Sequence, residues 1–164
     1  MKKTFCFLIG IVVYTACSPQ ANNTDPVYLR FPTIPNFTIY KAPDSTAFSR
    51  ENLQKKKPVL FMVFSPDCEH CKLATEELLA NIAGFKNTQI VMVTYLKYGE
   101  MIAFYKNYKI AEYPQVTMAS DTKYFFPVFF KVKNLPAIFL YDKKGDFKKA
   151  FEGSIKIDDI IAGL

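Results

Sequence analysis

The sequence lacks tryptophan, and it contains a single histidine and four cysteines among its 164 residues. It also lacks an arginine cluster or a dense basic stripe, although lysine plus arginine outnumber the acids by 21 to 15 and give a formal net charge of +6. This charge pattern argues against nucleic-acid binding. Half of the residues are apolar and 22% are charged, which excludes a disordered tail or a collagen-like rod and predicts a globular domain with a core.

The first seventeen residues have the pattern of an export signal. A Met-Lys-Lys start precedes an almost wholly apolar run over residues 4–14, and this run is shorter than the roughly 20 residues that span a bilayer. Thr15 and Ala16 then precede Cys17. The segment resembles a bacterial lipoprotein signal, which implies a signal peptide over residues 1–16 and lipidation of Cys17. An ordinary cleaved signal is the alternative.

Residues 17–31 form a polar spacer with few core-forming side chains. We expect a lipid anchor at Cys17, a flexible tether as far as residue 31, and one folded domain over residues 32–164. No acidic cluster follows Cys17. These features predict a protein that faces the periplasm and is attached to a bacterial membrane through its lipid.

Removal of the signal and acylation of the cysteine beside it leave two thiols in the domain, Cys68 and Cys71. A continuous apolar run over residues 58–64 precedes them and is typical of a strand buried on both faces. The residues after them favour a helix that continues to a stop at Gly84. The sequence therefore predicts Cys68 at a helix N-terminus and Cys71 one turn further along.

This placement predicts thiol–disulfide chemistry. Free N–H groups and the helix dipole stabilise an anion in the first turn, so a thiolate is favoured at Cys68. Cys68 would attack a substrate disulfide and form a mixed disulfide, which Cys71 would resolve; the reverse sequence would oxidise a dithiol. Both sulfurs are then expected to lie within reach of water.

The residues alone leave other uses of the pair open. Zinc prefers four protein ligands, whereas the domain offers only Cys68, Cys71 and His70. A static disulfide over so short a spacing would close too small a loop to add much stability. Copper capture by the two thiolates and His70 is another alternative, and so is a redox-inert module on the same scaffold. We predict no metal and no organic cofactor.

The chain resembles the thioredoxin superfamily, specifically the extracytoplasmic thiol–disulfide oxidoreductases of the TlpA/ResA type. The resemblance rests on the SPDCEHCK segment around the cysteines, on its lead-in over residues 34–60 and on residues 133–141. It implies an α/β thioredoxin-like fold with a mixed central β-sheet flanked by helices. It also implies that Pro136 is a cis-proline facing the cysteines and that Leu135 lines the peptide groove. The implied partners are protein thiol or disulfide substrates and a membrane thiol reductase or oxidase. From the residues alone, a proline at the start of a strand needs no special role.

The hydrophobic pattern predicts the remaining elements. Strands are expected over residues 88–96, 114–119, 137–141 and 147–151, helices over 101–108 and 158–161, and a hairpin turn at 142–145. The strand–helix–strand order predicts parallel strands and the late hairpin adds antiparallel ones, so the expected sheet is mixed.

Several positions around the cysteines depart from the family pattern. Asp67 replaces the tryptophan that is common before the first cysteine, and a carboxylate there opposes thiolate formation. Between the cysteines, a protonated His70 would stabilise a thiolate, whereas Glu69 would oppose it. Met62 stands where thioredoxin has a buried acid, so no proton acceptor for Cys71 is identified. The direction of the reaction, reduction or oxidation, is therefore not predicted.

Two further segments have unusual compositions. Residues 124–130 read YFFPVFF, for which core packing is the favoured interpretation and a partner-docking patch beside Pro136 is the alternative. The run Lys55-Lys56-Lys57 is interpreted as a solvated turn before the first buried strand.

Overall fold

The computed structural model describes residues 25–164. The predicted signal peptide, Cys17 and the predicted tether as far as residue 24 lie outside the described residues. Within residues 25–164, no helix combines the length and the apolar character needed to cross a membrane.

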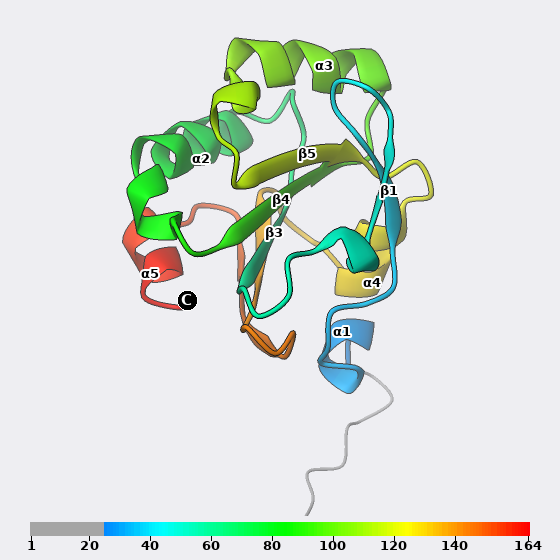
Figure 1. Cartoon of the computed structure of the whole chain (residues 1–164), viewed down its shortest axis with the longest axis vertical. Coiled ribbons are helices and arrows are strands. Elements are labelled where there is room, and N and C mark those ends of the chain that lie inside the picture. The colour runs from blue at the N-terminus through cyan, green and yellow to red at the C-terminus, as the bar shows by residue number, and fades with distance from the viewer. Residues whose placement is uncertain (1–24) are drawn as a thin grey trace, which may run out of the picture.

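A seven-stranded mixed β-sheet forms the centre of the described chain (Figure 1). Its strands are β1 (Thr38–Lys41), β2 (Ala47–Ser49), β3 (Val59–Val63), β4 (Gln89–Thr94), β5 (Val116–Ser120), β6 (Ala137–Tyr141) and β7 (Phe147–Glu152). They lie in the order β2-β1-β5-β4-β3-β6-β7. Strands β3, β4 and β5 are parallel, whereas β6 is antiparallel to both β3 and β7, and β1 is antiparallel to both β2 and β5.

Helices cover both faces of this sheet (Figure 1). One face carries α2 (Glu69–Ala80), α3 (Tyr98–Asn107) and α5 (Ile157–Ile161), and the other carries α1 (Val27–Arg30) and α4 (Phe125–Phe130). Single 3-10 turns lie at η1 (Arg50–Asn52), η2 (Ile82–Phe85) and η3 (Ile110–Glu112). The predicted α/β class with a mixed sheet flanked by helices is confirmed.

The central strand β3 shows why the sheet has two different cores. All five of its residues are buried, as expected for a parallel strand covered on both faces. Because side chains alternate along a strand, Leu60 and Met62 join the core under α2, whereas Phe61 and Val63 join the core under α4. The first core is rich in leucine and methionine and contains Cys71, while the second is dominated by aromatic rings.

The aromatic segment 124–130 contributes to the second core. Phe126 and Phe130 are fully buried, and the Phe130 ring stacks on Phe139 with 3.9 Å between centroids. Core packing is therefore confirmed for these two residues. Tyr124 and Val128 point outward and are 51% and 66% exposed.

The folded domain begins earlier than the sequence predicts. The expected tether extends to residue 31, but α1 forms inside it. Tyr28 on this helix packs against Phe130, Phe139 and Phe147 with ring centroids 5.7, 5.4 and 5.0 Å away. Each aromatic pair of this kind adds about 1 kcal/mol to the gain from burial. These contacts attach the segment to the domain.

The helix after the cysteines ends earlier than predicted. It was expected to continue to Gly84, but α2 ends at Ala80 and η2 follows as a separate turn. Asn81 is the C-cap of the helix, and its side-chain amide donates to the Glu77 carbonyl at 2.9 Å. The other predicted elements are present, with boundaries shifted by up to three residues.

Candidate active site

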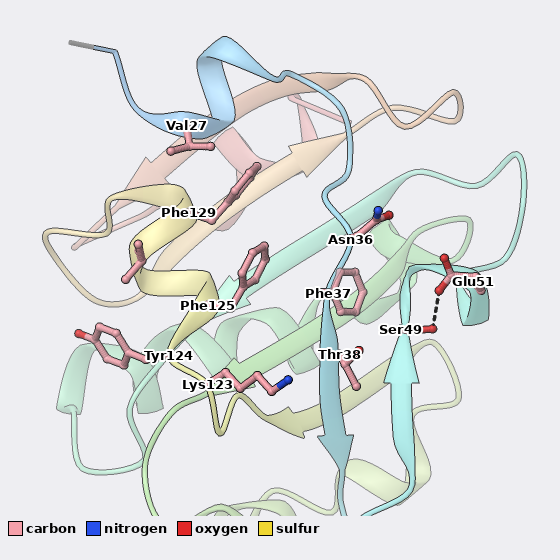
Figure 2. Close-up of a pocket in the computed structure, with 11 residues that line it drawn as sticks. Val27, Asn36, Phe37, Thr38, Ser49, Glu51, Lys123, Tyr124, Phe125 and Phe129 are labelled. Atoms are coloured by element: carbon pink, nitrogen blue, oxygen red, sulfur yellow. Dashed lines mark hydrogen bonds between the residues drawn. The ribbon is translucent and has the colours of Figure 1, made fainter. Parts of the chain in front are cut away.

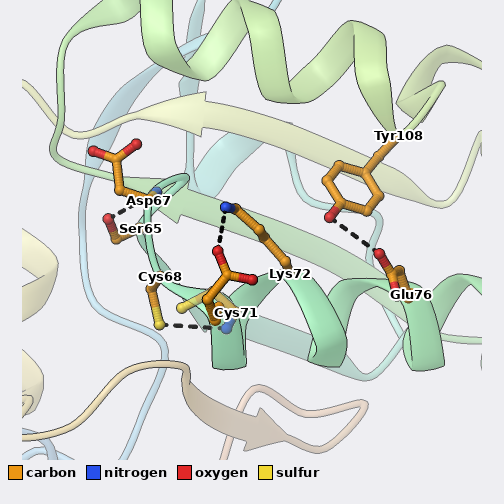
Figure 3. A network of polar contacts seen from close by, with 8 residues as sticks. Ser65, Asp67, Cys68, Cys71, Lys72, Glu76 and Tyr108 are labelled. Carbon is orange, nitrogen blue, oxygen red and sulfur yellow. Dashed lines mark hydrogen bonds and ion pairs between the residues drawn. The ribbon is translucent and has the colours of Figure 1, made fainter.

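Cys68 caps the N-terminus of α2. A short loop connects this position to the end of β3. Phe64 extends the pairing of β3 by donating its N–H to the Val93 carbonyl at 3.0 Å, and the Cys68 N–H closes the loop onto the Ser65 carbonyl at 3.1 Å. The Cys68 Sγ accepts a hydrogen bond from the Cys71 N–H at 3.3 Å (Figure 3). The sulfur thus occupies the capping position, where free N–H groups and the helix dipole stabilise a thiolate.

The two cysteines occupy different environments. Both are free thiols, but Cys68 is partly exposed whereas Cys71 is fully buried. The expectation that both sulfurs lie within reach of water is therefore wrong for Cys71, because the helix turns that side chain into the core under α2. Burial raises the pKa of Cys71 to about 12, and a hydrogen bond with Cys68 and the charge of that neighbour contribute in the same direction. The Cys71 thiol is consequently protonated at neutral pH.

The loop before β6 closes the other side of Cys68. The Leu135–Pro136 peptide bond is cis, as the family resemblance implies. The Cys68 thiol donates to the Leu135 carbonyl across 3.9 Å. The loop is tied to β7, since the Glu152 carboxylate accepts the Asn134 N–H at 3.1 Å. Pairing of β6 with β3 brings this loop, more than sixty residues away in sequence, beside the cysteines.

The charged residues near the cysteines make contacts of their own. The Glu69 carboxylate lies 2.6 Å from the Lys72 ammonium group, and this is the one ion pair within 4 Å in the described part of the chain. The Glu69 charge is therefore compensated by Lys72. Asp67 and His70 are exposed, so solvent weakens their influence on the Cys68 sulfur.

A metal site involving His70 finds no support in the geometry. Among the residues that the structure describes, no three His, Cys, Asp or Glu side chains are grouped so that they could hold a metal ion. His70 and the two cysteines, which the sequence offers as copper ligands, do not form such a group.

Tyr95 is a neighbour of the cysteines that sequence reasoning missed. It follows the end of β4, and its ring meets Tyr124 edge-to-face with 4.8 Å between centroids. Burial raises the pKa of Tyr95, as does negative charge on Tyr124, Cys71 and Cys68, so its hydroxyl lies within electrostatic range of both sulfurs. Its position directly after the strand that pairs with β3 was the available signal.

Met62 is fully buried in the core that contains Cys71, so this site has no acid there.

A separate hollow lies beside α4. Its lining residues include Phe37, Thr38, Phe125 and Phe129, which belong to α4 or to the β1 region (Figure 2). Neither cysteine lines it, nor does Pro136. The hollow is therefore distinct from the site around Cys68.

A family model described as a thioredoxin-like domain matches residues 49–164, which include both cysteines and the cis-proline loop. The chain belongs to the thioredoxin-like family. The predicted superfamily membership is thus confirmed. Among curated proteins, no sequence relative of this thioredoxin-like chain was found.

Solved structures with the same thioredoxin-like fold include two with Dsb names and one described as peroxiredoxin-like. A secreted Mycobacterium tuberculosis disulfide oxidoreductase homologous to E. coli DsbE is 19% identical, with a TM-score of 0.65 over 78% of this chain and 96% of that chain. MTB DsbF, in mixed oxidised and reduced forms, is 21% identical, with a TM-score of 0.61 over 85% and 96%. A peroxiredoxin-like protein from Aquifex aeolicus is 16% identical, with a TM-score of 0.62 over 79% and 82%. At these identities the likeness establishes the shared fold.

Proposed function

We propose that this thioredoxin-like protein is a thiol–disulfide oxidoreductase that exchanges disulfides with extracytoplasmic protein substrates through Cys68 and Cys71. The observation that carries the proposal is the position of the Cys68 sulfur. It accepts the Cys71 N–H at the start of α2 and faces the Leu135 carbonyl before the cis-proline. Two structural neighbours are described as disulfide oxidoreductases or by a Dsb name, which agrees with this chemistry.

The reaction uses the difference between the two cysteines. The Cys68 thiolate attacks one sulfur of a substrate disulfide, a Cys68–substrate bond forms, and the other substrate sulfur leaves and takes up a proton. Cys71 then loses its proton and attacks the Cys68 sulfur. A Cys68–Cys71 disulfide forms and the second substrate thiol is released, so two electrons pass from the protein to the substrate. The same steps in reverse oxidise a substrate dithiol.

The proposal also gives roles to the neighbours of the two cysteines. Leu135 and Pro136 form the wall against which the substrate peptide lies, because the Leu135 carbonyl faces the attacking sulfur. Glu69 and His70 tune the Cys68 thiolate from solvent, and the pairing of Glu69 with Lys72 limits its effect. The chemistry requires neither a metal nor an organic cofactor, because both electrons are carried by the sulfur atoms.

The proposed cellular setting rests on the pattern of the N-terminal sequence. Signal cleavage after residue 16 and lipidation of Cys17 place the domain in the periplasm on a membrane anchor. The partners are protein thiol or disulfide substrates and a membrane thiol reductase or oxidase that restores the cysteine pair.

Reduction of insulin disulfides in the presence of dithiothreitol tests the proposal. Wild type is expected to accelerate the reaction, whereas Cys68→Ser and Cys71→Ser fall to the uncatalysed rate. Ser65→Ala keeps both sulfurs and serves as the matched control, with a rate within about threefold of wild type; circular dichroism verifies the fold of each variant. A wild-type rate equal to the uncatalysed rate, or full activity of Cys68→Ser, would show that the domain is redox-inert towards proteins.

A further inference from the structure

The end of the sheet opposite the cysteines is rich in lysine. Strands β3 and β4 both begin at this end, and β6 finishes there because it runs antiparallel to β3. The loops at this end comprise residues 54–58, 86–88 and 142–148, and they contain seven lysines and two aspartates. We call these seven lysines the lysine end: Lys55, Lys56, Lys57, Lys86, Lys143, Lys144 and Lys148.

Four members of the lysine end share one surface hollow. Lys56, Lys57, Lys143 and Lys148 line it together with Asp142. The Asp142 carboxylate is engaged in its own turn, where it accepts the Lys144 N–H at 2.7 Å. None of the seven lysines lies within 4 Å of a carboxylate in the part of the chain that the structure describes. Their charges therefore add to a positive potential at this end.

Exposed apolar side chains lie next to the lysine end. Leu29 on α1 is 43% exposed and Phe31, directly after α1, is 62% exposed. The chain after Phe31 pairs with the lysine-bearing hairpin, since the Pro32 carbonyl accepts the Phe147 N–H at 2.6 Å. Figure 1 shows α1 and the turn between β6 and β7 at the same end of the molecule. Positive charge and apolar surface thus occur together.

We propose that this end of the domain docks on a bilayer surface that contains anionic headgroups. The lysines of the lysine end would lie against headgroup phosphates, and Leu29 and Phe31 would enter the boundary between headgroups and acyl chains. Charge complementarity favours such a surface, and exposed apolar side chains beside lysines suit a bilayer better than an acidic protein. The predicted lipidation site, Cys17, precedes α1 by ten residues, so a lipid there would be attached close in sequence to this end of the domain.

Docking in this way fixes the orientation of the candidate active site. Cys68 follows the end of β3 that is remote from the lysine end. The Cys68 sulfur would therefore face away from the bilayer, towards protein substrates.

Co-sedimentation of the full chain with vesicles tests the proposal. The vesicles are phosphatidylcholine alone or phosphatidylcholine mixed with phosphatidylglycerol. Because the apolar run at residues 4–14 would bind both, the readout is the ratio of the two affinities. Wild type is expected to prefer the anionic vesicles, and the preference is expected to fall as salt is added. A lysine-end triple variant should lose roughly tenfold to a hundredfold of this preference: Lys57→Gln, Lys143→Gln and Lys148→Gln.

A matched control removes three lysines near α3 instead: Lys97→Gln, Lys106→Gln and Lys109→Gln. Its preference should stay within about threefold of wild type. An equal loss in both triple variants would mean that net charge alone matters and would overturn the proposal. It would also be overturned if wild type bound soluble polyaspartate but showed no preference for anionic vesicles, since that result points to an acidic protein partner.

Two further measurements separate this proposal from the redox proposal. Phe31→Ser should weaken binding to anionic vesicles several-fold without changing the salt dependence, because it removes apolar contact only. An unchanged affinity would argue against insertion.

The lysine-end triple variant should reduce insulin at the wild-type rate. Loss of the vesicle preference with an unchanged insulin rate supports docking, whatever the insulin rate of the wild type proves to be.

Discussion

The two ends of the parallel strands β3 and β4 differ in how their charged and reactive groups are held. At the end where the strands finish, the Cys71 sulfur is buried and the Glu69 carboxylate is paired with Lys72. At the end where they begin, the seven lysines of the lysine end have no ion-pair partner in the described chain. The chemistry of the first end depends on burial and on the exact direction of backbone N–H groups. The electrostatics of the second end depend mainly on how many like charges the loops bring together. The comparison teaches that a reactive cysteine site requires the folded core. A positively charged surface requires only that loops rich in lysine lie close together.

The largest expected effect concerns the aromatic core under α4, which lies between the two ends of the sheet. Phe130 is fully buried and stacks on Phe139. Phe130→Ala should lower the free energy of unfolding by about 3–5 kcal/mol, because it removes a large ring and leaves a cavity. Urea unfolding followed by circular dichroism measures the change. Val128→Ala, at a 66% exposed position on the same helix, should change it by less than about 0.5 kcal/mol. Similar losses in both variants would contradict the assigned packing.

An intermediate effect concerns the buried thiol. The folded-state pKa of Cys71 is about 12, above its usual value of 9.0, so the unfolded chain loses this proton first as the pH rises. The stabilising contribution is complete below pH 9 and is lost progressively from pH 9 towards pH 12. We expect the free energy of unfolding of the reduced protein to fall by about 1 kcal/mol per pH unit from this group.

The check is urea unfolding of reduced wild type at several pH values from 7 to 10.5. Cys71→Ala lacks the group and should therefore show a smaller decrease with pH. Identical slopes would mean that Cys71 is ionised as easily in the folded protein as in the unfolded chain. The burial described for the first end of the sheet would then be incorrect.

The smallest effect concerns the ion pair on α2. Glu69 and Lys72 lie 2.6 Å apart, but their side chains are 76% and 36% exposed. Exposed pairs contribute little, so Glu69→Gln should change the free energy of unfolding by less than about 0.5 kcal/mol. Glu77→Gln, at an exposed position of the same helix, is the matched control. A loss above 1 kcal/mol for Glu69→Gln alone would show that this pair has a structural role.

Much of the fold was readable from local sequence. The unbroken apolar run at residues 59–63 predicted a fully buried strand, and β3 is one. The short loop after it predicted Cys68 at a helix start, where the structure places it. Such features depend on neighbouring residues, because a strand, a turn and a cap are specified within a few positions. The segment at residues 27–30 was harder, because Tyr28 is ordered by aromatic rings from distant parts of the chain.

The sequence by itself determined the pair of cysteines, the strand before them, the helix cap at Cys68 and the mixed α/β architecture. The tertiary structure decided that Cys71 is buried, that Tyr95 lies within electrostatic range of both sulfurs, and that Leu135 faces Cys68. It also gathered lysines from two separate loops around one surface hollow, although no dense basic stripe exists in the sequence. The physical reason is distance along the chain: caps and strands arise from local contacts, whereas burial, electrostatic proximity and surface potential arise where strand pairing joins residues far apart in sequence.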